Sequence, residues 1–191
     1  MPALRLEPST LVTLDRLILL LLTVILSAAL TAAMVMQFAF GEIPCPLCLL
    51  QRVAMFGCCF GLLQQLRARE SERGGGIALL FALLLLVIAA RQTLLDIVPR
   101  PGHAYIGTAV FGLHMPVWSV VIAVSLLLAL ALRLTVFGAP RPLPPAARPP
   151  LAQAARLLEF YVVLICALNL ASVVFQCGLG ECHTSGYRLL T

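Results

Sequence analysis

Long apolar runs, separated by short polar or proline-rich stretches, dominate the pattern of this chain. A helix needs about 20 residues to cross roughly 30 Å of hydrocarbon, and each run is long enough for that. The pattern predicts five membrane-spanning helices, at about residues 17–38, 46–66, 77–95, 117–137 and 157–176. The first run is longer than the apolar core of a signal peptide, so we interpret it as a retained helix. We therefore predict an all-α membrane protein.

The stretches between these runs differ in character. Residues 67–76 are charged and then glycine-rich, which predicts an exposed turn. Residues 96–115 form a longer loop, whose apolar content indicates a position on the membrane surface. Residues 138–150 contain six prolines, which favours an extended linker over a helix. The expected division is a helical core over residues 1–137, a cytoplasmic linker over 138–156, and a fifth helix with its tail over 157–191.

Composition and charge agree with a membrane protein and give its orientation. The chain is 61% hydrophobic and 11% charged, and its net charge of +5 comes from arginine because it has no lysine. We attribute this charge to membrane topology, and we expect no nucleic-acid partner. Most of the arginines fall on one side of the predicted helices, so the positive-inside rule puts the N-terminus in the cytoplasm. Five crossings then put the C-terminus outside.

The seven cysteines include two close pairs, Cys45/Cys48 and Cys177/Cys182. With the predicted orientation, both pairs lie at the outer face of the membrane, where an oxidising compartment lets disulfides persist. A buried cysteine usually behaves as a small apolar side chain with an inert thiol. On this ground we interpret the three cysteines inside apolar runs as packing residues, namely Cys58, Cys59 and Cys166.

The Cys45/Cys48 pair lies where a loop meets the second predicted helix. Pro46 suits the first turn of a helix, because it lacks an N–H and has a fixed φ. Cys48 then meets unpaired backbone N–H groups and the positive end of the helix dipole, which favour a thiolate. Arg52 lies one turn further on the same face, so we expect its guanidinium to reach back to the sulfur. We predict redox chemistry here, with an inert disulfide and half of a metal site as the alternatives.

A dithiol at the outer interface must pass its two electrons on, and the chain has no flavin, haem or nicotinamide motif. A lipid-soluble quinone is the acceptor that we expect. Arg52 and Arg91 both lie near the outer ends of their helices, where a fixed positive charge stabilises the anion formed during quinone reduction. For Arg91, snorkelling to the interface explains its position equally well. His103 and His114 are further candidates to hydrogen-bond a quinone oxygen, although we favour a surface role for His103.

Two segments resemble a known family. Residues 45–52 (CPLCLLQR) resemble the active-site motif of the DsbB family of membrane thiol oxidases, and residues 111–118 (FGLHMPVW) resemble the entry to that family's last helix. The resemblance covers about residues 14–137. It implies a four-helix DsbB-like transmembrane bundle, to which the fifth C-terminal helix is an addition.

The resemblance also implies an activity and its partners. DsbB-type proteins keep the bacterial periplasm oxidising by linking soluble DsbA-type thiol oxidoreductases to quinone. Cys45 and Cys48 are then the quinone-coupled pair, with Cys48 nearest the ring and Arg52 beside it. Gln51 belongs to the same motif and is a further candidate for quinone binding. The expected cofactor is ubiquinone or menaquinone, and the expected location is the bacterial inner membrane.

The chain departs from this family in one respect. The family usually carries a second cysteine pair in the loop before its last helix, whereas residues 96–115 contain no cysteine. We predict that Cys177/Cys182 is the pair that accepts electrons from the soluble partner and passes them to Cys45/Cys48. The alternative is a local staple that fastens the tail.

A rival function of a different class is metal binding or metal transfer, with the two cysteine pairs as soft ligands. Arg52 argues against it, since a cation beside a thiolate opposes metal binding. We therefore predict no metal site.

Overall fold

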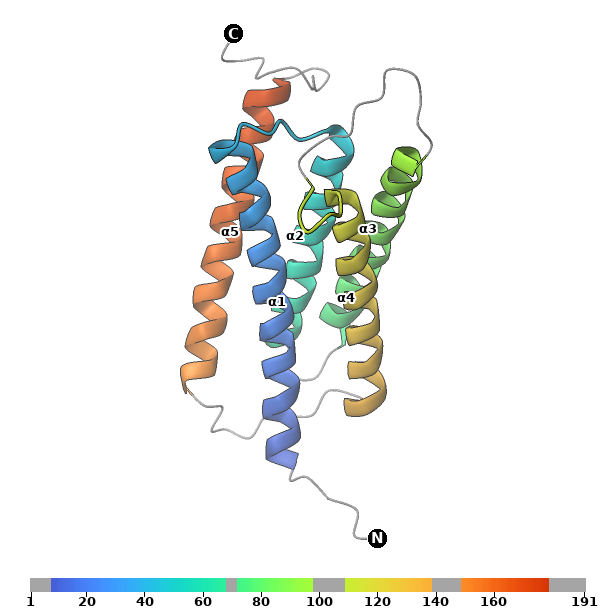
Figure 1. Cartoon of the computed structure of the whole chain (residues 1–191). Coiled ribbons are helices and arrows are strands. Elements are labelled where there is room, and N and C mark those ends of the chain that lie inside the picture. The colour runs from blue at the N-terminus through green and yellow to red at the C-terminus, as the bar shows by residue number, and fades with distance from the viewer. Residues whose placement is uncertain (1–7, 68–71, 98–108, 139–148, 179–191) are drawn as a thin grey trace.

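The computed structural model describes residues 8–67, 72–97, 109–138 and 149–178, and these residues form a bundle of five long helices (Figure 1). Each helix is long and apolar enough to cross a membrane, which confirms the predicted all-α membrane protein. The helices are α1 (Pro8–Ala39), α2 (Pro46–Arg67), α3 (Arg73–Ile97), α4 (Met115–Phe137) and α5 (Pro149–Cys177).

Three helices begin well before their patterns predict, among them α1, which begins at Pro8 and not at about residue 17. α5 begins at Pro149, so residues 149–156 belong to a helix and not to the predicted linker. The first turn of a helix accepts proline because its N–H groups have no intrahelical partner there. α3 begins at Arg73, so the glycines after it are the first turn of a helix and not part of an exposed turn. Gly74 and Gly75 are in fact buried.

Small residues bring α2 and α3 close together. The buried positions of α3 recur every three or four residues and are mostly glycine and alanine: Gly74, Gly75, Ala78, Ala82, Leu85, Ala89 and Gln92. A Cβ added to Gly61 of α2 would lie 2.5 Å from the backbone nitrogen of Ala78 and 2.7 Å from the carbonyl oxygen of Gly74. Close approach through small residues is the usual way in which membrane helices associate. The glycines therefore serve packing and not flexibility.

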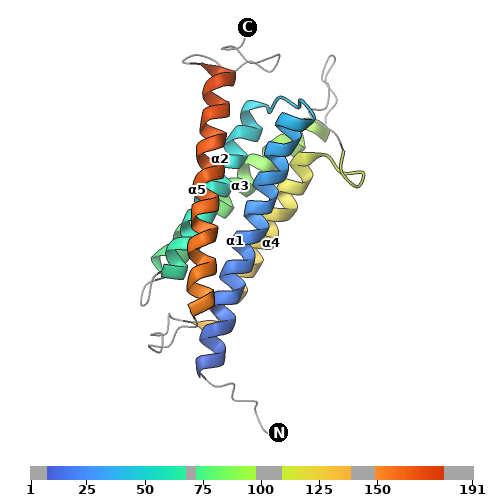
Figure 2. The same ribbon diagram turned by 90° about the vertical axis from the view of Figure 1, so that its left-hand side faces the viewer.

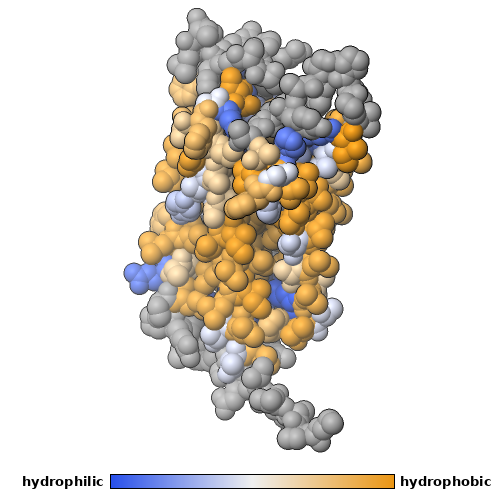
Figure 3. All heavy atoms as spheres, in the orientation of Figure 1, coloured by the Kyte–Doolittle hydropathy of each residue, from blue (hydrophilic) through white to orange (hydrophobic). Residues whose placement is uncertain are grey.

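Helix α2 packs against α3, α1 and α5, while α4 packs against α3 and, less extensively, against α1 (Figures 1 and 2). Large apolar side chains cover the outside of the bundle between its two ends (Figure 3). Such a surface is unfavourable in water but is the expected surface against lipid.

The end of the bundle near the N-terminus is fixed by a buried arginine. Arg133 of α4 donates hydrogen bonds to both oxygens of Asp15 on α1, at 2.6 and 3.1 Å. It also donates to both oxygens of Glu72, at 3.0 and 3.3 Å. An ion pair between Arg67 and Glu159 joins α2 to α5. These polar contacts lie at one end of the bundle. Cys45 and Cys48 lie at the opposite end, where α2 begins.

Candidate active site at the start of α2

Cys45 directly precedes α2 and caps it. Its Sγ accepts a hydrogen bond from the backbone N–H of Cys48 at 3.1 Å, and its carbonyl oxygen accepts one from Leu49 at 3.0 Å. A serine or aspartate at the same position would cap a helix in the same way. The N–H groups of the first turn were expected to favour a thiolate at Cys48, but one of them donates its hydrogen bond to the sulfur of Cys45.

Both sulfurs of the pair meet one side chain that the sequence analysis missed. Nε2 of Gln92, on α3, lies 3.5 Å from Sγ of Cys45 and 3.5 Å from Sγ of Cys48, and both cysteines are free thiols. The hydrogen bond with the Cys48 side chain, followed by burial, raises the pKa of Cys45 above its usual range. Cys45 therefore keeps its proton, and Cys48 is the half-buried thiol that lines a cavity.

A chain of hydrogen bonds links these sulfurs to α4. Gln51 donates from Nε2 to Oε1 of Gln92 at 2.8 Å, and Ser119 donates from Oγ to Oε1 of Gln51 at 2.8 Å. All three side chains are buried. Buried polar groups inside membrane helices are costly unless they are bonded. The chain therefore fixes the amide of Gln92 against the two sulfurs.

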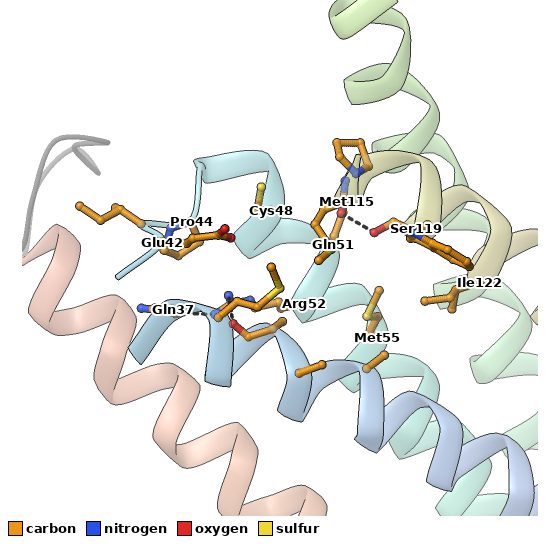
Figure 4. A pocket seen from close by; sticks show the side chains of 17 residues that line it. Gln37, Glu42, Pro44, Cys48, Gln51, Arg52, Met55, Met115, Ser119 and Ile122 are labelled. Carbon is orange, nitrogen blue, oxygen red and sulfur yellow. Dashed lines mark hydrogen bonds between the residues drawn. The ribbon is translucent and has the colours of Figure 1, made fainter. Parts of the chain in front are cut away.

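The guanidinium of Arg52, which was expected to reach back to Cys48, makes hydrogen bonds to α1 and α5. It donates to Oε1 of Gln37 at 2.6 Å and to the carbonyl oxygen of Ala33 at 3.0 Å, both on α1 (Figure 4). It also donates to Oδ1 of Asn169, on α5, at 3.2 Å. These three partners are uncharged, and they orient the guanidinium. Arg52 is buried and lines the same cavity as Cys48.

This cavity lies between α1, α2 and the start of α4, beside the loop that precedes Cys45 (Figure 4). Its volume is about 320 Å³, at the lower end of the range of about 300–1,000 Å³ for small-molecule sites. Its polar lining residues are Gln37, Glu42, Cys48, Gln51, Arg52 and Ser119. The rest is largely apolar and includes Ala29, Ala32, Ala33, Met36, Met55, Trp118 and Ile122. It suits a flat apolar molecule with polar atoms at its edge.

Two other predicted site residues lie outside this cavity. Arg91 is exposed on α3, which agrees with snorkelling, while the next residue, Gln92, points inward to the sulfurs. His114 precedes α4, and its carbonyl oxygen accepts the N–H groups of Val117 and Trp118 at 3.0 and 3.4 Å. Its side chain is not among the groups that line the cavity. His103 was a weaker candidate and lies outside the described residues.

The end of α5 contacts the segment before Cys45. Gln176 donates from Nε2 to the carbonyl oxygen of Pro44 at 2.9 Å, so Cys177 lies at the same end of the bundle as Cys45. Cys177 is buried and disulfide-bonded. The five other described cysteines are free thiols, so its partner lies outside the described residues, as does the predicted partner Cys182.

The remaining cysteines form no second site. Cys58 and Cys59 belong to the apolar core, as predicted. Cys166, in contrast, is exposed on α5 and is not a core residue. Among the described residues, no group of three or more histidine, cysteine and acidic side chains is placed to hold a metal ion.

The fold and the site define a class: a helical membrane protein with a dithiol at the start of one helix, beside a small apolar cavity. A family model described as disulfide bond formation protein DsbB matches residues 15–105. These residues include Cys45, Cys48, Gln51, Arg52 and Gln92. No curated protein and no solved structure matches the chain significantly. Residues 15–105 therefore resemble the DsbB family, which indicates a membrane protein of disulfide bond formation with disulfide oxidoreductase activity. Helix α5 lies outside the match.

Gln92 gives a first prediction. The Gln92→Leu variant loses the N–H group that faces both sulfurs, so we expect Cys48 in the reduced protein to be alkylated about two- to tenfold more slowly at neutral pH, as one hydrogen bond is worth roughly 0.5–1.5 kcal/mol. Iodoacetamide labelling followed by mass spectrometry measures this rate. The control is Arg91→Leu, which changes the exposed neighbour. An unchanged rate in Gln92→Leu contradicts the role.

Proposed function

We propose that this protein oxidises a DsbA-like dithiol protein on the periplasmic side of the bacterial inner membrane and passes the two electrons to a membrane quinone. The observation that carries the proposal is the cavity in which Cys48 and Arg52 meet between apolar walls. A thiol that reduces a lipid-soluble molecule needs such a place, shielded from water but supplied with a fixed positive charge.

The residues around the cavity fit a quinone ring. A flat ring could lie between the apolar walls, and Arg52, which lines the cavity, would stabilise negative charge on a ring oxygen. Its hydrogen bonds to Gln37, Ala33 and Asn169 hold the guanidinium in place before the ring enters, so it does not have to reorganise during the reaction. When bound, a quinone supplies the two-electron acceptor. Both ubiquinone and menaquinone meet this description.

The roles of the two cysteines follow from their surroundings. Cys48 faces the cavity, and Cys45 is held beside it by the shared contact with Gln92. Closing the Cys45–Cys48 disulfide releases two electrons and two protons to the quinone. A dithiol partner then reopens the disulfide by two successive thiol–disulfide exchanges, through a mixed disulfide, and leaves oxidised. The partner loses two electrons in each cycle, and the quinone gains two.

We further propose that Cys177/Cys182 relays electrons from the soluble partner to Cys45/Cys48. The contact between Gln176 and Pro44 supports this, since it joins the neighbours of Cys177 and Cys45. Cys177 is buried, so the partner's thiolate has to attack the other sulfur of that disulfide. This attack frees the thiol of Cys177, which follows Gln176 at the end of the bundle that holds the active site.

A direct assay tests the proposed function. The purified protein is reduced, freed of reductant without oxygen, and mixed with a short-chain quinone analogue. We expect loss of the quinone absorbance together with loss of two protein thiols for each quinone reduced. A metal analysis of the same protein tests the rival function. Stoichiometric binding of a soft metal ion, with no quinone reduction, contradicts the proposal.

The proposed orientation gives a second prediction. Phe111 precedes α4 at the end of the bundle that holds the cysteines, and it is 92% exposed. In intact cells, an impermeant maleimide should add one label to a Phe111→Cys variant and none to a Ser71→Cys variant, because residue 71 lies between α2 and α3 among the inner arginines. Mass tagging counts the labels. Labelling of Ser71→Cys alone would reverse the orientation.

A further inference from the structure

Helix α5 lies outside the matched family segment, yet its inward face changes character as it approaches the cysteines. Up to Gln176, its buried positions recur every three or four residues: Val162, Ile165, Asn169, Ser172 and Gln176. The first two are apolar and the last three are polar. A helix that only packed against its neighbours would keep this face apolar, because a buried amide in a membrane has to be matched by a partner.

Asn169 finds its partner in the active site. Its Oδ1 accepts a hydrogen bond from NH1 of Arg52 at 3.2 Å, and the same nitrogen donates to Gln37 at 2.6 Å. Helices α1, α2 and α5 therefore meet at one nitrogen of the arginine that lines the cavity. The position of α5 thus helps to set the direction of the guanidinium.

Gln176 acts on the other half of the site. It is fully buried and holds the carbonyl oxygen of Pro44, the residue directly before Cys45, at 2.9 Å. The segment at Pro44 places Cys45 where its sulfur caps α2 and meets the amide of Gln92. Gln176 therefore fixes the cysteine side of the site, whereas Asn169 fixes the arginine side.

We propose that α5 is part of the catalytic apparatus, with Asn169 as the positioning residue of Arg52 and Gln176 as the positioning residue of the Cys45 segment. This inference rests on the proposed function, since it assigns each residue to one half-reaction of the same site. The competing explanation is that both amides only attach α5 to the bundle. Attachment alone predicts equal effects on both half-reactions, but positioning predicts that each residue affects a different one.

The experiment compares three variants of the full chain in two assays. The thiol assay follows reduction of the Cys45–Cys48 disulfide by a small dithiol without quinone, and the quinone assay follows reoxidation of the reduced protein. The matched control is Tyr161→Phe, which removes another hydrogen bond of α5, the 2.7 Å contact with Thr31 on α1. This control should leave both assays unchanged.

We expect Asn169→Leu to lower kcat/KM for the quinone analogue about tenfold, as for loss of one hydrogen bond to a charged group, and to leave the thiol assay within about twofold of the parent. Gln176→Leu should slow the thiol assay several-fold, with the KM for the quinone analogue unchanged. If Asn169→Leu does not fold, Asn169→Ala makes the same comparison with a smaller side chain.

Two results would overturn the inference. One is a parallel loss in both assays for Asn169→Leu and Gln176→Leu, in step with a lower melting temperature. The other is a quinone assay that Asn169→Leu leaves unchanged. A parent protein that reduces no quinone overturns the proposed function instead. In that case the thiol assay of Gln176→Leu still tests the positioning of Cys45.

Discussion

The Arg52→Met variant should reduce a quinone analogue about 10²–10³-fold more slowly than the parent, the loss typical of removing one preorganised group that stabilises a developing anion. Methionine fills much of the space of the arginine stem but carries no charge. The variant also leaves Gln37 and Asn169 without the donor that they share. Stopped-flow measurement of quinone absorbance, starting from the reduced protein, gives the rate.

Arg91→Met is the matched control for this prediction. The two arginines have the same charge and both were candidates from their positions in the sequence, but Arg91 is exposed and only Arg52 lines the cavity. We expect the control to change the rate by less than about twofold. Equal losses in the two variants would mean that the charge near the outer surface matters and not the buried geometry of Arg52.

The helices were predictable because a membrane leaves few alternatives. Every backbone polar group in hydrocarbon has to be bonded within its own segment, so long apolar runs become helices. The errors occur at helix ends, because the residues at which these helices begin are not part of the apolar pattern. Gly74 and Gly75 looked like a flexible turn but allow α3 to pack against α2, and Pro149 looked like a linker residue but starts α5.

The site was predictable only where a local motif marks it. Cys45, Cys48, Gln51 and Arg52 are close in sequence, and all four lie beside or within the cavity region. Gln92 was not predicted as a site residue. Helix α3 is apolar on every side, so its pattern does not show which face turns inward.

Interactions between distant helices were also beyond the sequence. Asn169 and Gln176 lie more than a hundred residues from their partners, Arg52 and Pro44. The hydrogen bonds of Arg52 to α1 and α5 were missed for the same reason. Spacing along one helix predicted a contact with the sulfur of Cys48. Oxygen atoms of α1 and α5 are better hydrogen-bond acceptors for the guanidinium than a thiol sulfur is.

The role proposed for Cys177/Cys182 leads to a prediction about how the soluble partner is oxidised. Thiol–disulfide exchange needs direct contact between sulfurs, and the side chain of Cys45 is only 5% exposed. A thiol on a folded protein therefore reaches the sulfur of Cys45 with more difficulty than a small dithiol does. A relay through Cys177/Cys182 would remove this difficulty, because its second step takes place within one chain, in which the neighbours of Cys177 and Cys45 are in contact.

We therefore expect the Cys177→Ser/Cys182→Ser double variant to oxidise a reduced DsbA-like partner at least about tenfold more slowly than the parent with quinone present. Reduction of its Cys45–Cys48 disulfide by a small dithiol should remain at the parental rate, which shows that the site itself is intact. The matched control is Cys166→Ser, which removes an exposed cysteine of the same helix without touching either pair. Partner oxidation is followed by alkylating and counting its free thiols over time. A double variant that turns over as fast as the parent would make the tail disulfide a staple, and the partner would then have to reach Cys45 directly.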